Sequence, residues 1–183
     1  NIFQVNRGLF FTIAELTIRP GKSIREYLDG SRKKYFKPIT YVLVLSTLYY
    51  LISHGLDKET VLGDLRLGFL EGVEDKGSSY ESIEHLFNWM SNNFAYAILA
   101  LIPLYAVASY VTFIDKGYNL MEHIVLHSYI FGHQALINSL FVLCSLFIGD
   151  DEASLLIVIS SILYNFWVFV KFIKVKNWVF MLL

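Results

Sequence analysis

Residues 120–148 read LMEHIVLHSYIFGHQALINSLFVLCSLFI, a 29-residue apolar stretch that contains no lysine or arginine. A helix needs about 20 mostly apolar residues to cross roughly 30 Å of hydrocarbon, so this stretch is long enough to span a bilayer. Three other segments have the same character: Ile39 to His54, Asn93 to Ile114 and Ala153 to Ile173. The sequence therefore predicts an all-α integral membrane bundle with at least four transmembrane helices.

The composition agrees with a membrane protein. Hydrophobic residues make up 55% of the chain and the mean hydropathy is +0.50, against an apolar share of about 45–50% in soluble domains. The sequence contains no nucleotide-binding loop, nucleophile elbow, metalloprotease helix or nucleic-acid module. We therefore assign no enzymatic activity, expect no cofactor, and expect the lipid bilayer rather than nucleic acid as a partner.

Charge is segregated along the chain. Residues 1–37 hold eight Lys and Arg against three acids, whereas residues 55–92 hold three against eight. Because cytoplasmic loops carry an excess of Lys and Arg, this pattern places the N-terminus in the cytoplasm. It divides the chain into a cytoplasmic, interfacial segment at 1–37 and a transmembrane bundle at 38–183 with an extracytoplasmic loop at 55–92. Apolar residues at helical spacing in that loop predict two short helices that cap the bundle.

The segment before the first span predicts an amphipathic helix that lies in the membrane interface. It is too short to span, and Pro20-Gly21 ends it. A second short helix follows from Lys22 to Asp29. Basic residues surround both helices and either hold anionic headgroups or only anchor the topology, and the sequence leaves both readings open. These residues are Arg19, Lys22, Arg25, Arg32, Lys33, Lys34 and Lys37.

Polar side chains inside the spans are costly to bury and are candidates for a site. They are Glu122, His123, His127, His133, Gln134, Asn138 and Asn165, and we expect the last four at the midplane with Ser46, Thr47 and Pro103. One interpretation is that these side chains form hydrogen bonds between neighbouring helices. Another is that they line a proton or solute path in which His133 titrates. His123 and His127, at i and i+4, could share a metal with Glu122, but a closed zinc site needs four ligands.

Nearly the whole chain resembles a known family. The motif residues are Arg19-Pro20-Gly21-Lys22, Arg25-Glu26-Tyr27-Leu28, Gly30, Arg32 and Tyr35-Phe36-x-Pro38, followed by Glu122-His123. They resemble the signature of a bacterial multi-pass membrane protein family described only as a domain of unknown function. The resemblance implies the bacterial inner membrane and this topology, and it brings no activity. Relatives carry flanking segments, and residues 178–183 predict the first turns of a fifth span.

These observations leave three functional hypotheses. The first is a non-enzymatic accessory or scaffold subunit that holds other membrane protein subunits, because catalytic clusters are absent and the spans are rich in aromatic residues. The alternative is a small transporter or channel that uses the midplane polar layer. The third is a metal- or haem-dependent membrane enzyme at Glu122, His123 and His127.

Overall fold

The computed structural model describes residues 2–72 and 78–173, and this part of the chain is all-α, as predicted. The helices are α1 (Ile2–Ile18), α2 (Pro20–Leu28), α3 (Pro38–Gly55), α4 (Val61–Glu71), α5 (Ser78–Asn92), α6 (Phe94–Thr112), the 3-10 helix η1 (Ile114–Lys116), α7 (Leu120–Ile148) and α8 (Asp150–Ile173). The fifth span predicted at 178–183 lies outside the described residues.

Three of the described helices, α6, α7 and α8, are long and apolar enough to cross a membrane. By length and composition they indicate a membrane protein. The predicted first span coincides with α3, which is not among the three. Its apolar residues are interrupted by Ser46, Thr47, Ser53 and His54 together with three tyrosines. A fourth span therefore stays a prediction.

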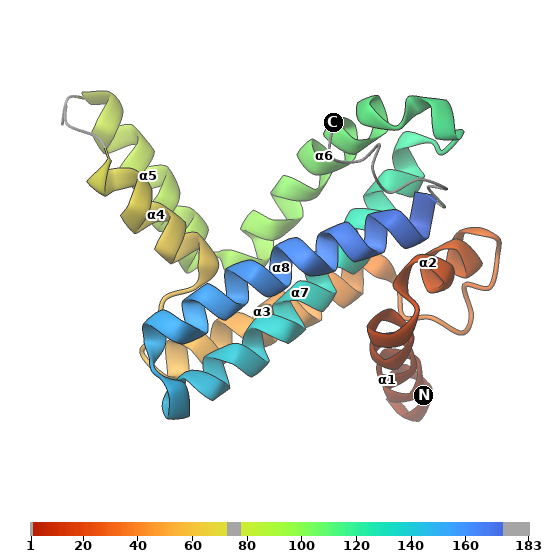
Figure 1. The fold of residues 1–183 in the computed structure, drawn as a ribbon, viewed down its shortest axis with the longest axis horizontal. Coiled ribbons are helices and arrows are strands. Elements are labelled where there is room, and N and C mark those ends of the chain that lie inside the picture. The colour runs from red at the N-terminus through yellow and green to blue at the C-terminus, as the bar shows by residue number, and fades with distance from the viewer. Residues whose placement is uncertain (1, 73–77, 174–183) are drawn as a thin grey trace.

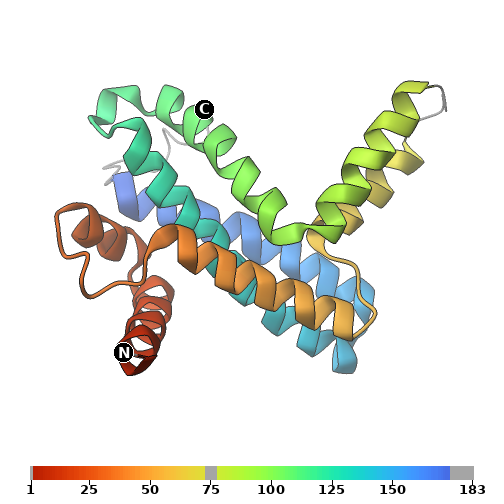
Figure 2. The ribbon, with the colours of Figure 1, turned by 180° about the vertical axis from the view of Figure 1, so that it is seen from behind.

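The bundle is built around α7, which packs against α3, α6 and α8. Its contact with α3 is the most extensive, and Gly132 allows it. A Cβ atom at Gly132 would lie 2.6 Å from the Tyr41 ring and 3.0 Å from the Cα of Val42, so only glycine permits this approach. Figures 1 and 2 show α3, α7 and α8 side by side. Near its C-terminal end α6 contacts α7 through Ser109 and His123.

The two N-terminal helices pack at one end of this bundle. α1 runs across the direction of α3, α7 and α8 in both views (Figures 1 and 2). The sequence predicts the second helix from Lys22 to Asp29, but α2 begins at Pro20, because proline fits the first turn of a helix, where its missing N–H costs nothing. α2 docks on the C-terminal end of α8. The N-terminal segment is thus joined to the last described helix, and its place in the membrane interface stays a prediction.

The loop between α3 and α6 forms a helical hairpin, α4 and α5, close to the two short helices that the sequence predicts. Its base joins the core through Leu62, which is 5% exposed. Beyond this base the hairpin projects away from α3, α7 and α8 instead of capping their ends (Figure 1). The two helices pack on each other, and Phe69 and Phe87 lie 5.5 Å apart between ring centroids. Apolar pairing within the hairpin explains why it does not fold back over the bundle.

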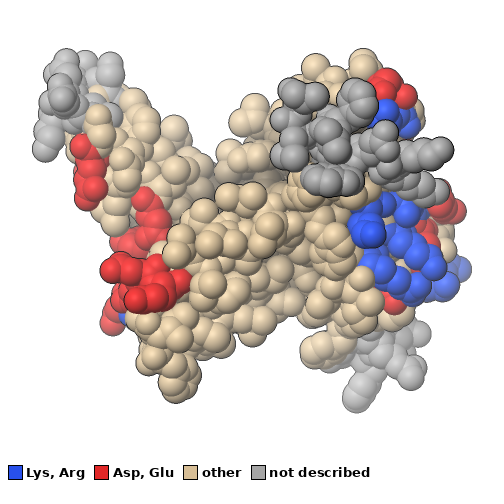
Figure 3. Space-filling model, viewed as in Figure 1, with Lys and Arg blue, Asp and Glu red and all other residues tan. Residues whose placement is uncertain are grey.

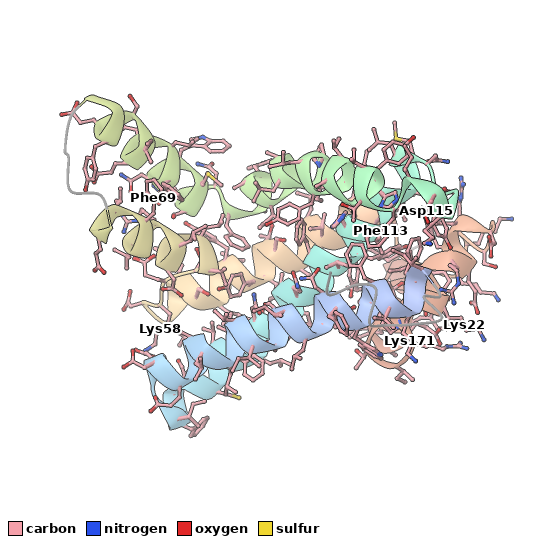
Figure 4. The ribbon with its side chains drawn as sticks, turned by 45° about the horizontal axis from the view of Figure 1, so that its top comes forward. Lys22, Lys58, Phe69, Phe113, Asp115 and Lys171 are labelled. Carbon is pink, nitrogen blue, oxygen red and sulfur yellow. The ribbon has the colours of Figure 1, made fainter. Side chains whose placement is uncertain are left out.

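Charged side chains gather at opposite ends of the molecule. Figure 3 shows a cluster of Lys and Arg over the end that carries α2 and a cluster of Asp and Glu at the other end. In Figure 4, Lys22, Lys171 and Asp115 lie at the first end and Lys58 lies at the second. Between these ends the surface is mostly uncharged, which is the pattern of a protein whose middle faces lipid.

Candidate functional site

A hollow between α6 and α8 is lined by three of the seven polar residues that the sequence singles out, Gln134, Asn138 and Asn165. It has a volume of about 290 Å³ and is lined by residues of α3, α4, α6, α7 and α8. Its polar lining consists of Ser46, Gln134, Asn138, Ser161 and Asn165. Exposed apolar side chains at its rim, such as Leu65 and Ile162, show that it opens to the surface of the bundle. We call this hollow the α6–α8 groove.

Helical spacing brings these side chains to one place. Gln134 and Asn138 lie one turn apart on α7, as do Ser161 and Asn165 on α8. The side-chain amide nitrogens of Gln134 and Asn165 both donate to the carbonyl oxygen of Ser161, at 3.0 and 3.1 Å. The Gln134 bond joins α7 to α8, and the Asn165 bond lies within α8.

Two polar atoms of the groove residues are buried and unpaired. Neither Oδ1 of Asn138 nor Oγ of Ser46 has a hydrogen-bond partner among the described residues. Asn138 is 7% exposed and Ser46 is fully buried. A buried polar group without a partner costs about 1–3 kcal/mol, so these two atoms favour a ligand that brings a hydrogen-bond donor.

His133 lies apart from the groove, although the sequence places it in the same layer. Its Nδ1 lies 3.0 Å from the Tyr41 hydroxyl, its Nε2 lies 3.3 Å from Oγ1 of Thr17, and its ring stacks on Tyr164 at 5.0 Å. The Thr17 hydroxyl donates its one hydrogen to the carbonyl oxygen of Ile13. Thr17 must therefore accept from Nε2–H of His133, and Tyr41 donates to Nδ1. His133 is neutral and fully paired in this arrangement.

His123 and His127 form a second histidine cluster with Ser109 of α6. The Ser109 Oγ lies 2.8 Å from Nδ1 of His123 and 2.9 Å from Nε2 of His127, and it donates to the carbonyl oxygen of Ala106. Both histidines therefore donate to one serine oxygen. Nε2 of His123 and Nδ1 of His127 are left buried without a partner in the described structure. Aromatic rings of Tyr105, Tyr110, Tyr118, Phe131 and Phe169 surround the pair.

Glu122 does not join the two histidines. It completes a capping box with Asn119, whose backbone N–H donates to the Glu122 carboxylate at 2.7 Å while Asn119 Oδ1 accepts from the Glu122 N–H. The expected third ligand is thus engaged at the start of α7. Within residues 2–72 and 78–173 there is no group of three or more His, Cys, Asp or Glu side chains that could hold a metal ion.

Three of the seven basic residues in the N-terminal segment have internal partners. Arg19 donates to the Glu15 carboxylate at 2.7 and 2.8 Å, and these bonds lower the pKa of Glu15 against the opposing effect of its partial burial. Arg25 donates to the carbonyl oxygens of Lys171 and Phe172 and so caps α8. Lys22 forms an ion pair with Glu26 at 3.7 Å. Arg32, Lys33, Lys34 and Lys37 form no ion pair with any described acidic side chain.

Several residues of these clusters are not distinguished by the sequence alone. Ser109 lies between Ala108 and Tyr110 in the apolar helix α6, and no sequence pattern marks it. Thr47 and Pro103, which we expect in the midplane layer, are exposed and line no described pocket. Ser161 acts through its backbone carbonyl, which no side-chain pattern reveals.

Comparison with known proteins gives one match. Residues 6–50 match the model of a family described as "Protein of unknown function (DUF3667)". The matched region contains the complete motif from Arg19 to Pro38, together with α2 and most of α3. No curated protein and no solved structure matches the chain. The match identifies a domain of unknown function at this end of the molecule, and the bacterial membrane setting implied by the resemblance stays a prediction.

Proposed function

We propose that this protein is a four-span, non-enzymatic membrane protein that acts as an accessory or scaffold subunit. In this proposal the α6–α8 groove receives a transmembrane helix of a partner protein. The N-terminus lies in the cytoplasm, and the membrane is the bacterial inner membrane.

The observation that carries the proposal is the pair of unpaired polar atoms in the groove, Oδ1 of Asn138 and Oγ of Ser46. Hydrocarbon offers no water to pair with them. An acyl chain has no hydrogen-bond donor either, whereas a partner helix with Ser, Thr, Asn or Gln on its surface has one. Such interhelical bonds contribute about 0.6 kcal/mol on average, and the apolar walls add packing contacts.

The arrangement of α3 supports the fourth span. α3 lies alongside α7 and parallel to it. The Tyr129 hydroxyl, within α7, donates to the carbonyl oxygen of Phe36 just before α3, and Lys58 after α3 pairs with Asp150 after α7. α3 therefore accompanies α7 from Tyr129 to its C-terminal end and would cross the membrane beside that part of α7. The separation of basic and acidic side chains between these ends supports the orientation (Figure 3).

The structure gives less support to the transporter alternative. That hypothesis uses His133 as the titrating group of a continuous polar layer. His133 is fully paired with Tyr41 and Thr17 and does not line the groove. These bonds favour a structural role for His133, in which it joins helices by hydrogen bonds.

A photo-crosslinking experiment tests the proposal. A photoreactive amino acid replaces Ile162, which lines the groove, or Leu155, which lies on the same helix outside it, in the full chain in its native membranes. The two side chains have similar exposed fractions, 64% and 60%, so they form a matched pair. We expect one protein adduct of defined mass at 162 and only lipid adducts at 155.

Two further variants connect the adduct to the polar lining. Asn138→Leu should abolish the adduct at 162, whereas Ser160→Ala, at a serine that bonds its own helix, should preserve it. Lipid adducts alone at 162 would contradict the proposal, because the groove would then hold lipid. An adduct of twice the chain's mass would also contradict it, because the occupant would be a second copy.

A further inference from the structure

Three of the four basic residues that form no ion pair line a second hollow. It has a volume of about 530 Å³ and lies between the end of α2 and the start of α3. Its lining includes the basic residues Arg32, Lys33 and Lys37 together with Tyr27, Pro38 and Ile39. Lys34 belongs to the same loop but does not line the hollow. We propose that this hollow binds the phosphate of an anionic phospholipid at the cytoplasmic face of the membrane.

The loop that carries the cations is held in place at its C-terminal end. The Tyr35 hydroxyl donates to Glu26 at 2.8 Å, and burial together with this bond raises the pKa of Tyr35 to about 12. The backbone N–H of Phe36 donates to Oγ1 of Thr12, and its carbonyl oxygen accepts from Tyr129. The Arg32 guanidinium lies 5.9 Å from the centroid of the Tyr27 ring, at a distance suited to a cation–π contact. The charges are thus presented by an ordered backbone.

The start of α3 adds to the attraction for an anion. Pro38 is the first residue of the helix, and Lys37 at the N-cap gives no side-chain bond to the free N–H groups of the first turn. The positive end of the helix dipole therefore faces the same hollow as the three cations. The basic side chains carry the site, and the helix terminus reinforces it.

A lipid fits this hollow better than a soluble phosphate does. Part of the lining is apolar, and Ile39 there is 45% exposed. Thr40, which also lines the hollow, begins an exposed face of α3 that continues one turn at a time with Val44 and Leu48, and these two side chains offer a path for acyl chains. A phospholipid contacts the basic side chains through its phosphate and the apolar side chains of α3 through its acyl chains. Inorganic phosphate contacts only the basic side chains.

The inference differs from ordinary topology anchoring in one testable respect. Anchoring depends on the number of positive charges in the segment, whereas a site depends on their positions. Lys33→Gln/Lys37→Gln removes two charges that line the hollow. Lys22→Gln/Lys34→Gln removes two charges from the same segment outside it, one already paired with Glu26. The second double variant is therefore a charge-matched control.

The test uses the full chain in phosphatidylcholine nanodiscs with added phosphatidylglycerol of the same chain length, and measures bound lipid per protein by native mass spectrometry. We expect selective retention of phosphatidylglycerol. A basic side chain close to an anionic headgroup contributes about fivefold in affinity, so Lys33→Gln/Lys37→Gln should weaken retention about 25-fold. The control double variant should change it less than about threefold. Unfolding temperatures of all three proteins identify any loss of fold.

Three results would overturn the inference. Equal retention of phosphatidylcholine would show that the hollow does not recognise charge. An equal loss in the control double variant, with the fold intact, would show anchoring by total charge. Displacement of phosphatidylglycerol by inorganic phosphate at similar concentration would show a site for a soluble anion instead of a lipid.

Discussion

The polar residues inside the bundle differ in how fully their hydrogen bonds are satisfied. His133 is paired at both ring nitrogens, and Ser109 accepts from two histidines at once. Asn138 and Ser46 keep one unpaired atom each, as do His123 and His127, but of these four only Asn138 and Ser46 line a described pocket. The proposed function therefore rests on the groove, where unpaired atoms and a hollow occur together, and not on His133.

Ser109 provides a test of this view at a single atom. Ser109→Ala removes the oxygen to which His123 and His127 both donate and leaves two buried N–H groups without an acceptor. Each such group costs about 1–3 kcal/mol, so we expect a loss of a few kcal/mol in the free energy of unfolding. Thr112→Ala is the control, because Thr112 lies on the same helix and bonds only its own backbone. Denaturant unfolding of detergent-solubilised protein measures both, and equal values would contradict the bonding scheme.

Among the elements, α2 shows why the motif has its residues. Gly21 lies against the backbone of α8, where a Cβ atom would come 2.3 Å from the carbonyl carbon of Lys171. Arg25 caps the last carbonyl groups of the same helix. Glu26 holds Tyr35 ahead of α3. The motif thus joins the interfacial segment to both the first and the last described helices of the bundle.

Gly21→Ala should therefore detach α2 from α8. The new methyl group meets backbone atoms that cannot move aside as a flexible side chain could, so we expect a loss of about 1–3 kcal/mol in the free energy of unfolding and faster hydrogen exchange in α2. Gly68→Ala, in α4, is the matched change because nothing lies within 4 Å of its Cβ position. We expect it to be neutral or to stabilise by about 0.5–1 kcal/mol. Unchanged exchange in α2 of Gly21→Ala would argue against this docking.

The sequence predicts the helices well because the residues at and near each helix end determine where the helix begins and ends. Runs of apolar residues set their lengths, and Pro20 and Pro38 mark where helices begin. The arrangement of polar groups depends instead on which neighbour lies opposite, which no single helix encodes. Gln134 and His133 are adjacent in sequence, yet Gln134 bonds Ser161 of α8, whereas His133 bonds Tyr41 of α3 and Thr17 of α1 and stacks on Tyr164 of α8. The same reason explains why the direction of the α4–α5 hairpin could not be predicted.

For the whole molecule, the separation of charge along the bundle is the feature that decides orientation. The basic end carries the turn before α3, the turn between α6 and α7, and the end of α8, whereas the acidic end carries the turns after α3 and α7 (Figures 3 and 4). If α6, α7 and α8 cross the membrane, α3 must cross it as well. Only then do all the basic turns lie on one side of the membrane and all the acidic turns on the other. The fourth span is therefore predicted from the separation of charge, and the cytoplasmic N-terminus follows from the rule that basic turns lie inside.

Labelling of single cysteines tests that prediction directly. Cys144 is the only cysteine, so Cys144→Ser gives a background into which Lys34→Cys, Glu59→Cys, Asp115→Cys or Asp151→Cys is introduced at an exposed position. A membrane-impermeant maleimide added to intact spheroplasts should label the cysteines at 59 and 151, and those at 34 and 115 only after permeabilisation. Labelling of 34 and 59 on the same side would show that α3 does not cross. Labelling of 34 and 115 from outside, with 59 and 151 protected, would keep the four spans but reverse the orientation, because positive charge would then no longer mark the cytoplasmic side.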